Sequence, residues 1–166
     1  MELQERDDRW IIPVGDGEVV RVSLDYARVT VMCDAVAINI GGRMVITSPS
    51  GELAEVDPDP GVNSPISLAP VLPVLRNTIQ EVIAFKTGGL FIGFADGSEI
   101  EVPADPDYEA WEAVELGNAQ GLRVISGPGG KLTIWQGDRG LSGQANVLRI
   151  GHSRCARSDE ARTPSL

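Results

Sequence analysis

Apolar and polar residues alternate with a period of two in the first third of the chain. In residues 20–24 the valines and the leucine alternate with polar residues, and the alternation continues through residues 28–33 and 36–40. Successive side chains of a strand point to opposite faces, so this pattern predicts strands with one buried and one solvated face. Residues 19–47 therefore form a first predicted block of strands.

A second block follows a proline-rich middle and begins near Thr78. Its predicted strands are residues 78–85, 90–94, 100–102, 108–114, 122–126 and 131–135. Leu90, Ile92 and Phe94 form the predicted inward face of one of these strands. The segments 28–40 and 89–102 resemble each other weakly, as a duplicated hairpin unit would.

Tight turns are predicted where glycine-containing dipeptides accept a positive φ. These dipeptides are Asp16-Gly17, Gly41-Gly42, Gly88-Gly89 and Asp96-Gly97, and residues 128–130 form the last turn. Residues 48–63 form a predicted loop with one short strand at 52–56.

Residues 66–75 are the one predicted helix. Ile66, Ala69, Leu72 and Leu75 recur at helical spacing, whereas prolines within the segment oppose a long regular helix. We therefore expect a short broken helix that covers one end of the sheet.

Together these patterns predict an all-β protein, in which antiparallel meanders form a sandwich or a half-open barrel. The 19 glycines and 11 prolines suit many short strands joined by turns. The predicted organisation is a charged N-terminal segment at 1–17 and a single β-rich domain of two hairpin blocks at 18–136. A Gly- and Arg-containing, largely disordered tail is predicted at 137–166.

Acidic residues dominate the charge of the predicted domain. The net charge is −10, and no Lys or Arg occurs between Lys86 and Arg123. The C-terminal segment from Arg149 onwards carries four arginines against two acids, so the rest of the chain is more negative still. This charge opposes binding to nucleic acid and to anionic membranes and favours a basic protein partner.

Neither a membrane anchor nor a secretory signal is predicted. No apolar run approaches the roughly 20 residues that span a bilayer, and the first nine residues are highly charged. Cys33 lies in an apolar strand pattern and Cys155 in the polar tail, which is unlike a disulfide framework. We expect a cytoplasmic protein with reduced thiols.

The sequence offers no positioned catalytic system, so we expect a non-enzymatic protein without metal or cofactor. The single histidine, His152, lies in the predicted tail, and Cys33 has the phase of a buried thiol. The acidic segment 55–63 lacks the spacing of a calcium loop, and the glycines of 127–130 lack a following helix. A pair of catalytic carboxylates stays open as an alternative.

The acidic run from Asp96 to Glu115 is expected to form one acidic face and, with its aromatic residues, is the candidate partner-binding site. Trp111 is interpreted either as a core residue whose N–H finds a partner or as an exposed anchor surrounded by carboxylates. The acidic run itself either binds a partner or only keeps the sheet soluble. The predicted partner-binding residues are Asp96, Glu99, Glu101, Asp107, Tyr108, Glu109, Trp111 and Glu112.

Three motifs in the second block resemble an uncharacterised bacterial β-domain family. They are the string Gly89–Gly97 with its F-x-D-G ending, the sequence Tyr108-Glu-Ala-Trp111, and the P-G-G of residues 128–130. The resemblance covers about residues 19–135. Similar domains occur among immunity-like proteins of bacterial toxin systems, and the resemblance therefore implies a protein that binds and blocks a toxin.

Our functional expectation is a protein-binding module, immunity-like in kind, that presents an acidic β-face to a basic partner. The alternative is a small-ligand or enzymatic pocket at the mouth of the barrel, near Tyr108 and Trp135. No oligomeric state is predicted.

Overall fold

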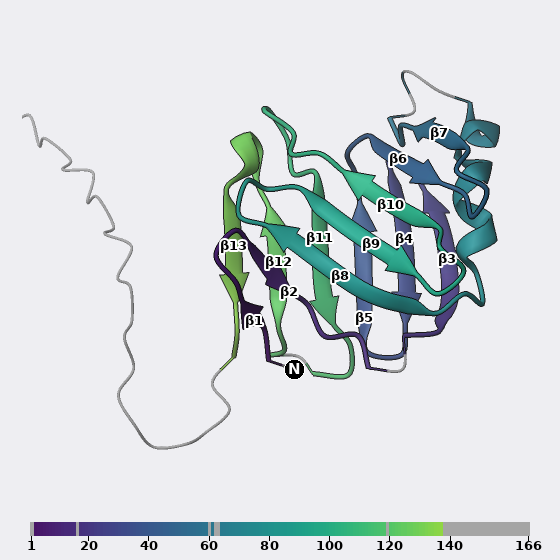
Figure 1. Cartoon of the computed structure of the whole chain (residues 1–166). Coiled ribbons are helices and arrows are strands. Elements are labelled where there is room, and N and C mark those ends of the chain that lie inside the picture. The colour runs from purple at the N-terminus through teal and green to yellow at the C-terminus, as the bar shows by residue number, and fades with distance from the viewer. Residues whose placement is uncertain (1, 16, 60, 62–63, 119, 138–166) are drawn as a thin grey trace, which may run out of the picture.

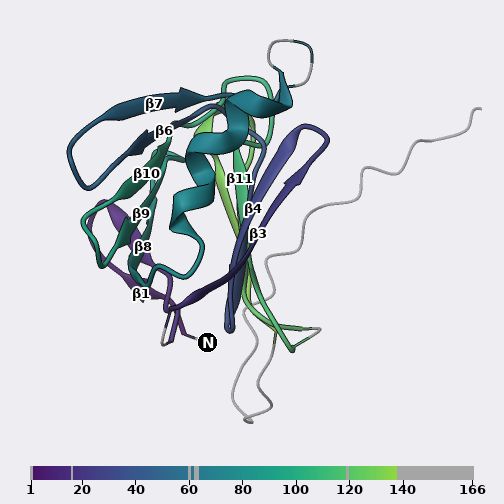
Figure 2. The same cartoon turned by 90° about the vertical axis from the view of Figure 1, so that its right-hand side faces the viewer.

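The computed structural model describes residues 2–15, 17–59, 61, 64–118 and 120–137. Two antiparallel sheets pack face to face, as Figure 1 and the side view in Figure 2 show. The all-β prediction is confirmed, and the arrangement is that of a sandwich. The predicted tail, apart from Gly137, lies outside the described residues.

The seven-stranded sheet takes strands from three separate parts of the chain. In spatial order its strands are β1 (Gln4–Glu5), β2 (Arg9–Ile11), β8 (Ile79–Phe85), β9 (Leu90–Phe94), β10 (Glu99–Val102), β6 (Met44–Thr47) and β7 (Leu53–Val56). The two N-terminal strands lie in the segment predicted only as charged. Their attachment includes an ion pair of 2.7 Å between Lys86 Nζ and Glu5 Oε1.

The six-stranded sheet has the order β13 (Leu132–Trp135), β12 (Arg123–Ser126), β11 (Trp111–Glu115), β5 (Val36–Ile40), β4 (Arg28–Cys33) and β3 (Val19–Asp25). Two 3₁₀ helices complete the fold, η1 (Pro65–Val74) and η2 (Pro128–Gly130). Neither helix is long enough and apolar enough to cross a membrane, and the described residues contain no other helix.

The two predicted blocks are interleaved across the sheets. The first block places β3–β5 in the six-stranded sheet and β6 in the seven-stranded sheet, where β7 of the predicted loop joins it. The second block does the reverse with β8–β10 and β11–β13. β5 pairs with β11, and β10 pairs with β6 in the equivalent position. The weakly similar segments contain β4–β5 and β9–β10, which correspond to each other in this arrangement and so support a duplication.

Two predicted hairpins are in fact crossings between the sheets. Gly41-Gly42 lies between β5 and β6, which belong to different sheets, and Gly17 lies between β2 and β3. The hairpin predictions there are wrong. Glycine indicates that the backbone can turn, but it does not indicate whether the next strand pairs with the previous one. Gly42 is needed for close packing, since a Cβ there would lie 3.2 Å from the Ala110 Cα. The hairpins at Gly88-Gly89 and Asp96-Gly97 are confirmed.

The predicted inward phase holds for most strands and fails at β3. Leu90, Ile92 and Phe94 are buried as predicted. In β3, however, Val20 and Leu24 are exposed and Val19 is buried. The register of β3 shifts between Val19 and Arg21. Such a bulge adds one residue to the strand, so Val19 points inward where strict alternation would turn it outward.

The predicted helix exists, but its buried face is a different one. Ile66, Leu72 and Leu75 are exposed, whereas Leu68, Val71 and Val74 are buried. A 3₁₀ helix has three residues per turn, so residues spaced by three share a face. η1 contacts β3 and β7 and covers the gap between these two edge strands (Figure 2).

Candidate functional site

The structure distributes the eight predicted partner-binding residues over three parts of the fold. Asp96, Glu99 and Glu101 belong to the β9–β10 hairpin of the seven-stranded sheet, whereas Trp111 and Glu112 belong to β11 of the six-stranded sheet. Asp107, Tyr108 and Glu109 lie in the loop between them. The expectation of one continuous acidic face from Asp96 to Glu115 is therefore wrong, because the chain changes sheets within the run.

Trp111 is a core residue with a defined partner. Only 1% of its surface is exposed, and its Nε1 donates a hydrogen bond of 2.8 Å to the Gly88 carbonyl oxygen. The Ser126 hydroxyl donates to the same oxygen at 2.7 Å. The alternative of an exposed anchor is excluded, so Trp111 is no contact for a partner of the folded protein.

Gly88 joins the motifs that carry the family resemblance. It lies in the β8–β9 turn with φ 95°, and a Cβ on it would lie 2.2 Å from the Gly130 Cα of the P-G-G motif. Trp111 ends the Y-E-A-W motif and donates to the Gly88 oxygen. The three motifs thus meet where the two sheets touch, and their role there is structural.

Glu112 is neutralised within its own sheet. Arg123 Nε forms a short ion pair with Glu112 Oε1, and Asn39 Nδ2 donates to Glu112 Oε2 at 3.2 Å. The Thr30 hydroxyl donates in turn to Asn39 Oδ1 at 2.9 Å. This chain of contacts crosses β4, β5, β11 and β12 and occupies the carboxylate, so Glu112 offers little charge to a partner.

Asp96 stabilises the hairpin turn in which it lies. The Ser98 hydroxyl and backbone N–H donate to Asp96 Oδ1 at 2.6 and 2.8 Å. The hydrogen bond from the Ser98 side chain holds the pKa of Asp96 below its usual 3.8. A lowered folded-state pKa means that the contribution to stability is present above pH 3.8 and is lost as the pH falls through the lowered value.

The ionisable side chains of five neighbouring strands in the seven-stranded sheet are all acidic. β8, β9, β10, β6 and β7 contain four glutamates and no Lys or Arg. The glutamates are Glu55, Glu81, Glu99 and Glu101. We call the outward side of these strands the acidic sheet face. The nearest cation on the adjoining β2, Arg9, pairs with Asp8 and lies 5.3 Å from the centre of the Phe85 ring.

Strand register brings apolar side chains to the middle of the acidic sheet face. Ile83, Phe91, Glu101, Val45 and Glu55 occupy one row across the five strands. Ile83 is buried, whereas Phe91 and Val45 are half-buried. Three apolar residues and two carboxylates thus share this row.

A shallow apolar pocket of about 390 Å³ opens on the acidic sheet face. Its lining includes Val45, Phe85, Phe91 and Pro103, with Glu101 at one wall. Gly93, beside Phe91, leaves room for the ring, since a Cβ there would lie 3.1 Å from Phe91 Cε1. The arrangement suits an apolar side chain whose neighbours carry positive charge.

The sequence interpretation missed Phe91 as a surface residue, although its phase was visible. Leu90 and Ile92 point inward, so the residue between them must point outward. The sequence therefore did indicate an exposed aromatic residue, because Phe91 occupies a position of the strand where a polar residue is expected. Glu55 carried no such signal, because its closeness to Glu101 depends on the pairing of β6 with β10, which are far apart in the chain.

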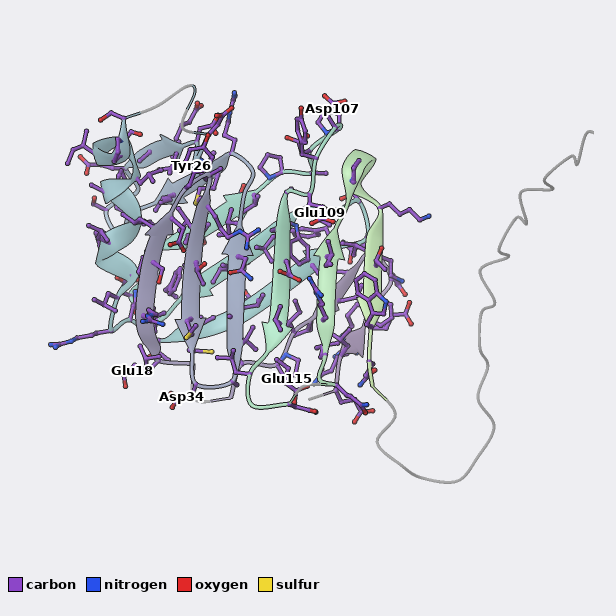
Figure 3. The ribbon with its side chains drawn as sticks, turned by 180° about the vertical axis from the view of Figure 1, so that it is seen from behind. Glu18, Tyr26, Asp34, Asp107, Glu109 and Glu115 are labelled. Atoms are coloured by element: carbon purple, nitrogen blue, oxygen red, sulfur yellow. The ribbon has the colours of Figure 1, made fainter. Side chains whose placement is uncertain are left out.

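Tyr108 lies at the end of the sandwich where Figure 3 shows Tyr26, Asp107 and Glu109, away from the end that carries Glu18, Asp34 and Glu115. It lines a hollow of about 650 Å³ that we call the loop-end hollow. Trp135 does not line this hollow. It pairs with Arg123, at the end of β12 that is remote from the hollow. The alternative pocket with both Tyr108 and Trp135 is therefore wrong.

Cys33 is buried, as its place in the apolar strand pattern predicted. Its thiol donates a long hydrogen bond, with 3.6 Å between Sγ and the Val36 carbonyl oxygen. His152 and Cys155 lie outside the described residues. Within the described part of the chain, no three His, Cys, Asp or Glu side chains gather as they would around a metal ion.

A family model described as a family of unknown function, DUF6188, matches residues 10–136. The match runs from β2 to just beyond β13 and so spans most of both sheets. No curated protein and no solved structure matches the chain. The expectation of a family without an assigned activity is confirmed: the chain belongs to the DUF6188 family of unknown function.

Proposed function

We propose that the chain is a non-enzymatic binding module whose acidic sheet face receives a basic protein. The observation that carries this proposal is the set of four glutamates on five strands that contain no Lys or Arg. The described ion pairs involve none of these glutamates. The charge of Glu55, Glu99 and Glu101 is therefore available to a partner, whereas that of Glu81 also interacts with Arg9.

Apolar surface within the acidic sheet face supplies the second component of a binding site. Partner affinity generally comes from a few apolar anchors in pockets, whereas surrounding charges speed association and select the partner. Phe91 and the pocket beside it are suited to the first role, and Glu99 and Glu101 to the second. Like charges would oppose face-to-face pairing of two copies of the chain.

The resemblance to immunity-like proteins suggests what kind of basic protein binds the acidic sheet face. It points to a cationic bacterial toxin that the chain would bind and block. An acidic inhibitor is the electrostatic complement of a cationic toxin, and such pairing accelerates association.

Affinity capture with matched variants tests the proposal. The immobilised chain should capture a basic protein at about 0.05 M salt and lose most of it at about 0.5 M salt, because salt screens charges. We expect Phe91→Ser to weaken binding of that protein about 30-fold, as loss of a hot-spot residue does. Glu99→Gln combined with Glu101→Gln should slow association about tenfold and flatten the salt dependence.

Asp34→Asn is the control, since this exposed aspartate lies in the β4–β5 turn of the six-stranded sheet (Figure 3). It removes one charge and should leave binding within about twofold of the wild type. A partner that binds all variants equally, at either salt concentration, would contradict the proposal. Growth inhibition by the captured protein, relieved by the wild type but not by Phe91→Ser, would identify it as a toxin.

A further inference from the structure

The loop-end hollow has two tyrosine rings at its walls that are almost fully exposed. Tyr26 is 87% and Tyr108 is 75% exposed, and both line the hollow of about 650 Å³. Its walls come from four separate connections, namely the β3–β4 turn, residues 41–43, residues 57–59 and residues 103–109. Exposed aromatic rings beside a concave surface mark a place where a ligand gains contact area.

Both rings are carried by turns with defined geometry. Tyr26 lies at the tip of the β3–β4 hairpin, which the pairing of Asp25 with Arg28 closes. The backbone N–H of Tyr108 donates to Asp105 Oδ1 at 2.9 Å, and this bond shapes its loop. Because these turns fix the backbone, a ligand would have to order only the side-chain torsions of the two tyrosines and not the loops that carry them.

The charges around the rings select a cation. Among the described residues, the lining of the hollow includes four carboxylates and one basic side chain, Arg43, which lies 3.9 Å from Asp57. The carboxylates are those of Asp57, Asp59, Asp105 and Glu109. Aromatic faces attract cations as carboxylates do, whereas an anion would be repelled by both.

A second hollow of about 360 Å³ adjoins the first and shares Tyr26, Asp57 and Asp59 with it. Its remaining walls are mostly apolar and include Leu24, Pro65 and Leu68. An occupant that fills both hollows therefore needs a cationic group and, next to it, an apolar group. A polypeptide segment supplies both, whereas a small amine supplies only the first.

We propose that the two hollows together bind a segment of another protein that carries an arginine next to a large apolar residue. The guanidinium lies against Tyr26 and Tyr108 with the carboxylates around it, and the apolar side chain enters the hollow beside Leu68. Arginine suits this position better than lysine, because its planar group stacks on aromatic rings and is more weakly hydrated. The proposal uses no residue of the acidic sheet face, so it is independent of the function proposed for that face.

Calorimetric titration of the full chain with a capped Gly-Ser-Arg-Leu-Ser-Gly peptide tests the proposal. Tyr26→Ala and Tyr108→Ala should each weaken binding about three- to tenfold, which corresponds to the strength of one cation–π contact. Tyr26→Phe and Tyr108→Phe should bind within about twofold of the wild type, because the ring and not the hydroxyl is used. A citrulline peptide, which is neutral, should bind at least about tenfold more weakly.

Four outcomes would overturn the assignment. The first is equal binding of the citrulline peptide, and the second is unchanged affinity in the double Tyr→Ala variant with an intact circular dichroism spectrum. The third is equal affinity for free guanidinium, which would make the ligand a small cation. The fourth is tighter peptide binding when Arg149, Arg154, Arg157 and Arg162 are replaced by Gln, which would make the chain's own C-terminal segment the occupant. Phe91→Ser should leave peptide binding unchanged, so failure here is distinguishable from failure at the acidic sheet face.

Discussion

At the scale of single residues, Gly88 does more for this fold than any charged residue of the acidic run. Its carbonyl oxygen accepts hydrogen bonds from Trp111 and Ser126, which both lie in the opposite sheet. Gly130 packs against the Gly88 Cα so closely that no side chain fits between them. A buried polar bond of this kind is costly to leave unsatisfied, so the contact fixes how the two sheets meet.

Replacing Gly88 with alanine should destabilise the protein by about 2–5 kcal/mol, from backbone strain together with a clash. The strain arises from φ 95°, and the clash from a Cβ that would lie 2.2 Å from the Gly130 Cα. Urea unfolding measures the change.

Gly97→Ala is the matched control for that variant. Gly97 has φ 85°, but no atom lies within 4 Å of a Cβ at this position. It should therefore show the cost of strain alone, about 1–2 kcal/mol. Equal losses in the two variants would mean that close packing against Gly130 contributes nothing.

At the scale of secondary-structure elements, η1 shows how a correct element can be assigned a wrong face. Ile66, Leu72 and Leu75 lie on one face of a helix with three residues per turn, and they are exposed. Leu68, Val71 and Val74 recur with the same spacing on another face, and these residues are buried. Both patterns are present in one segment, and only the contacts with β3 and β7 decide between them.

Two leucine variants of η1 distinguish the two faces. Leu68→Ala should cost about 2–3 kcal/mol, as truncation of a buried leucine does. Leu72→Ala should cost less than about 1 kcal/mol, because the Leu72 side chain is 47% exposed. Both are the same chemical change and can be measured by thermal or urea unfolding. A larger loss for Leu72→Ala would restore the helical face predicted from the sequence.

Most strands, though not β1 and β2, were predictable from local patterns, whereas strand partners were not. Period-two alternation identifies Leu90, Ile92 and Phe94 as inward, and by the same rule it places Phe91 outward. The same rule says nothing about Gly41-Gly42, where the chain leaves one sheet for the other. The acidic sheet face depends on such long-range pairing, because β6 and β7 reach β10 only through this crossing.

At the scale of the whole molecule, neither block holds a complete sheet. β5 needs β11 and β6 needs β10, so each sheet is completed by strands from the other block. Local sequence patterns cannot reveal this, since the pairing joins residues far apart in the chain. The same arrangement explains why an acidic run that is continuous in sequence is divided between two sheets.

Fragments cut after Gly61 should not fold separately. The fragment up to Gly61 lacks the partners of β2, β5 and β6, and the remainder lacks β5 and β6 themselves. We expect neither fragment to unfold cooperatively in urea and the mixture to regain a cooperative transition. Circular dichroism measures both. A cooperative transition in one isolated fragment would show that a block is a folding unit of its own.

The pairing of β5 with β11 also has a consequence for synthesis on the ribosome. The edge of β5 stays without its partner until some seventy further residues have been made and have left the exit tunnel. An open strand edge in a nascent chain attracts other strands and is a site of misassembly. Chaperone occupancy of arrested nascent chains should therefore fall once β11 emerges.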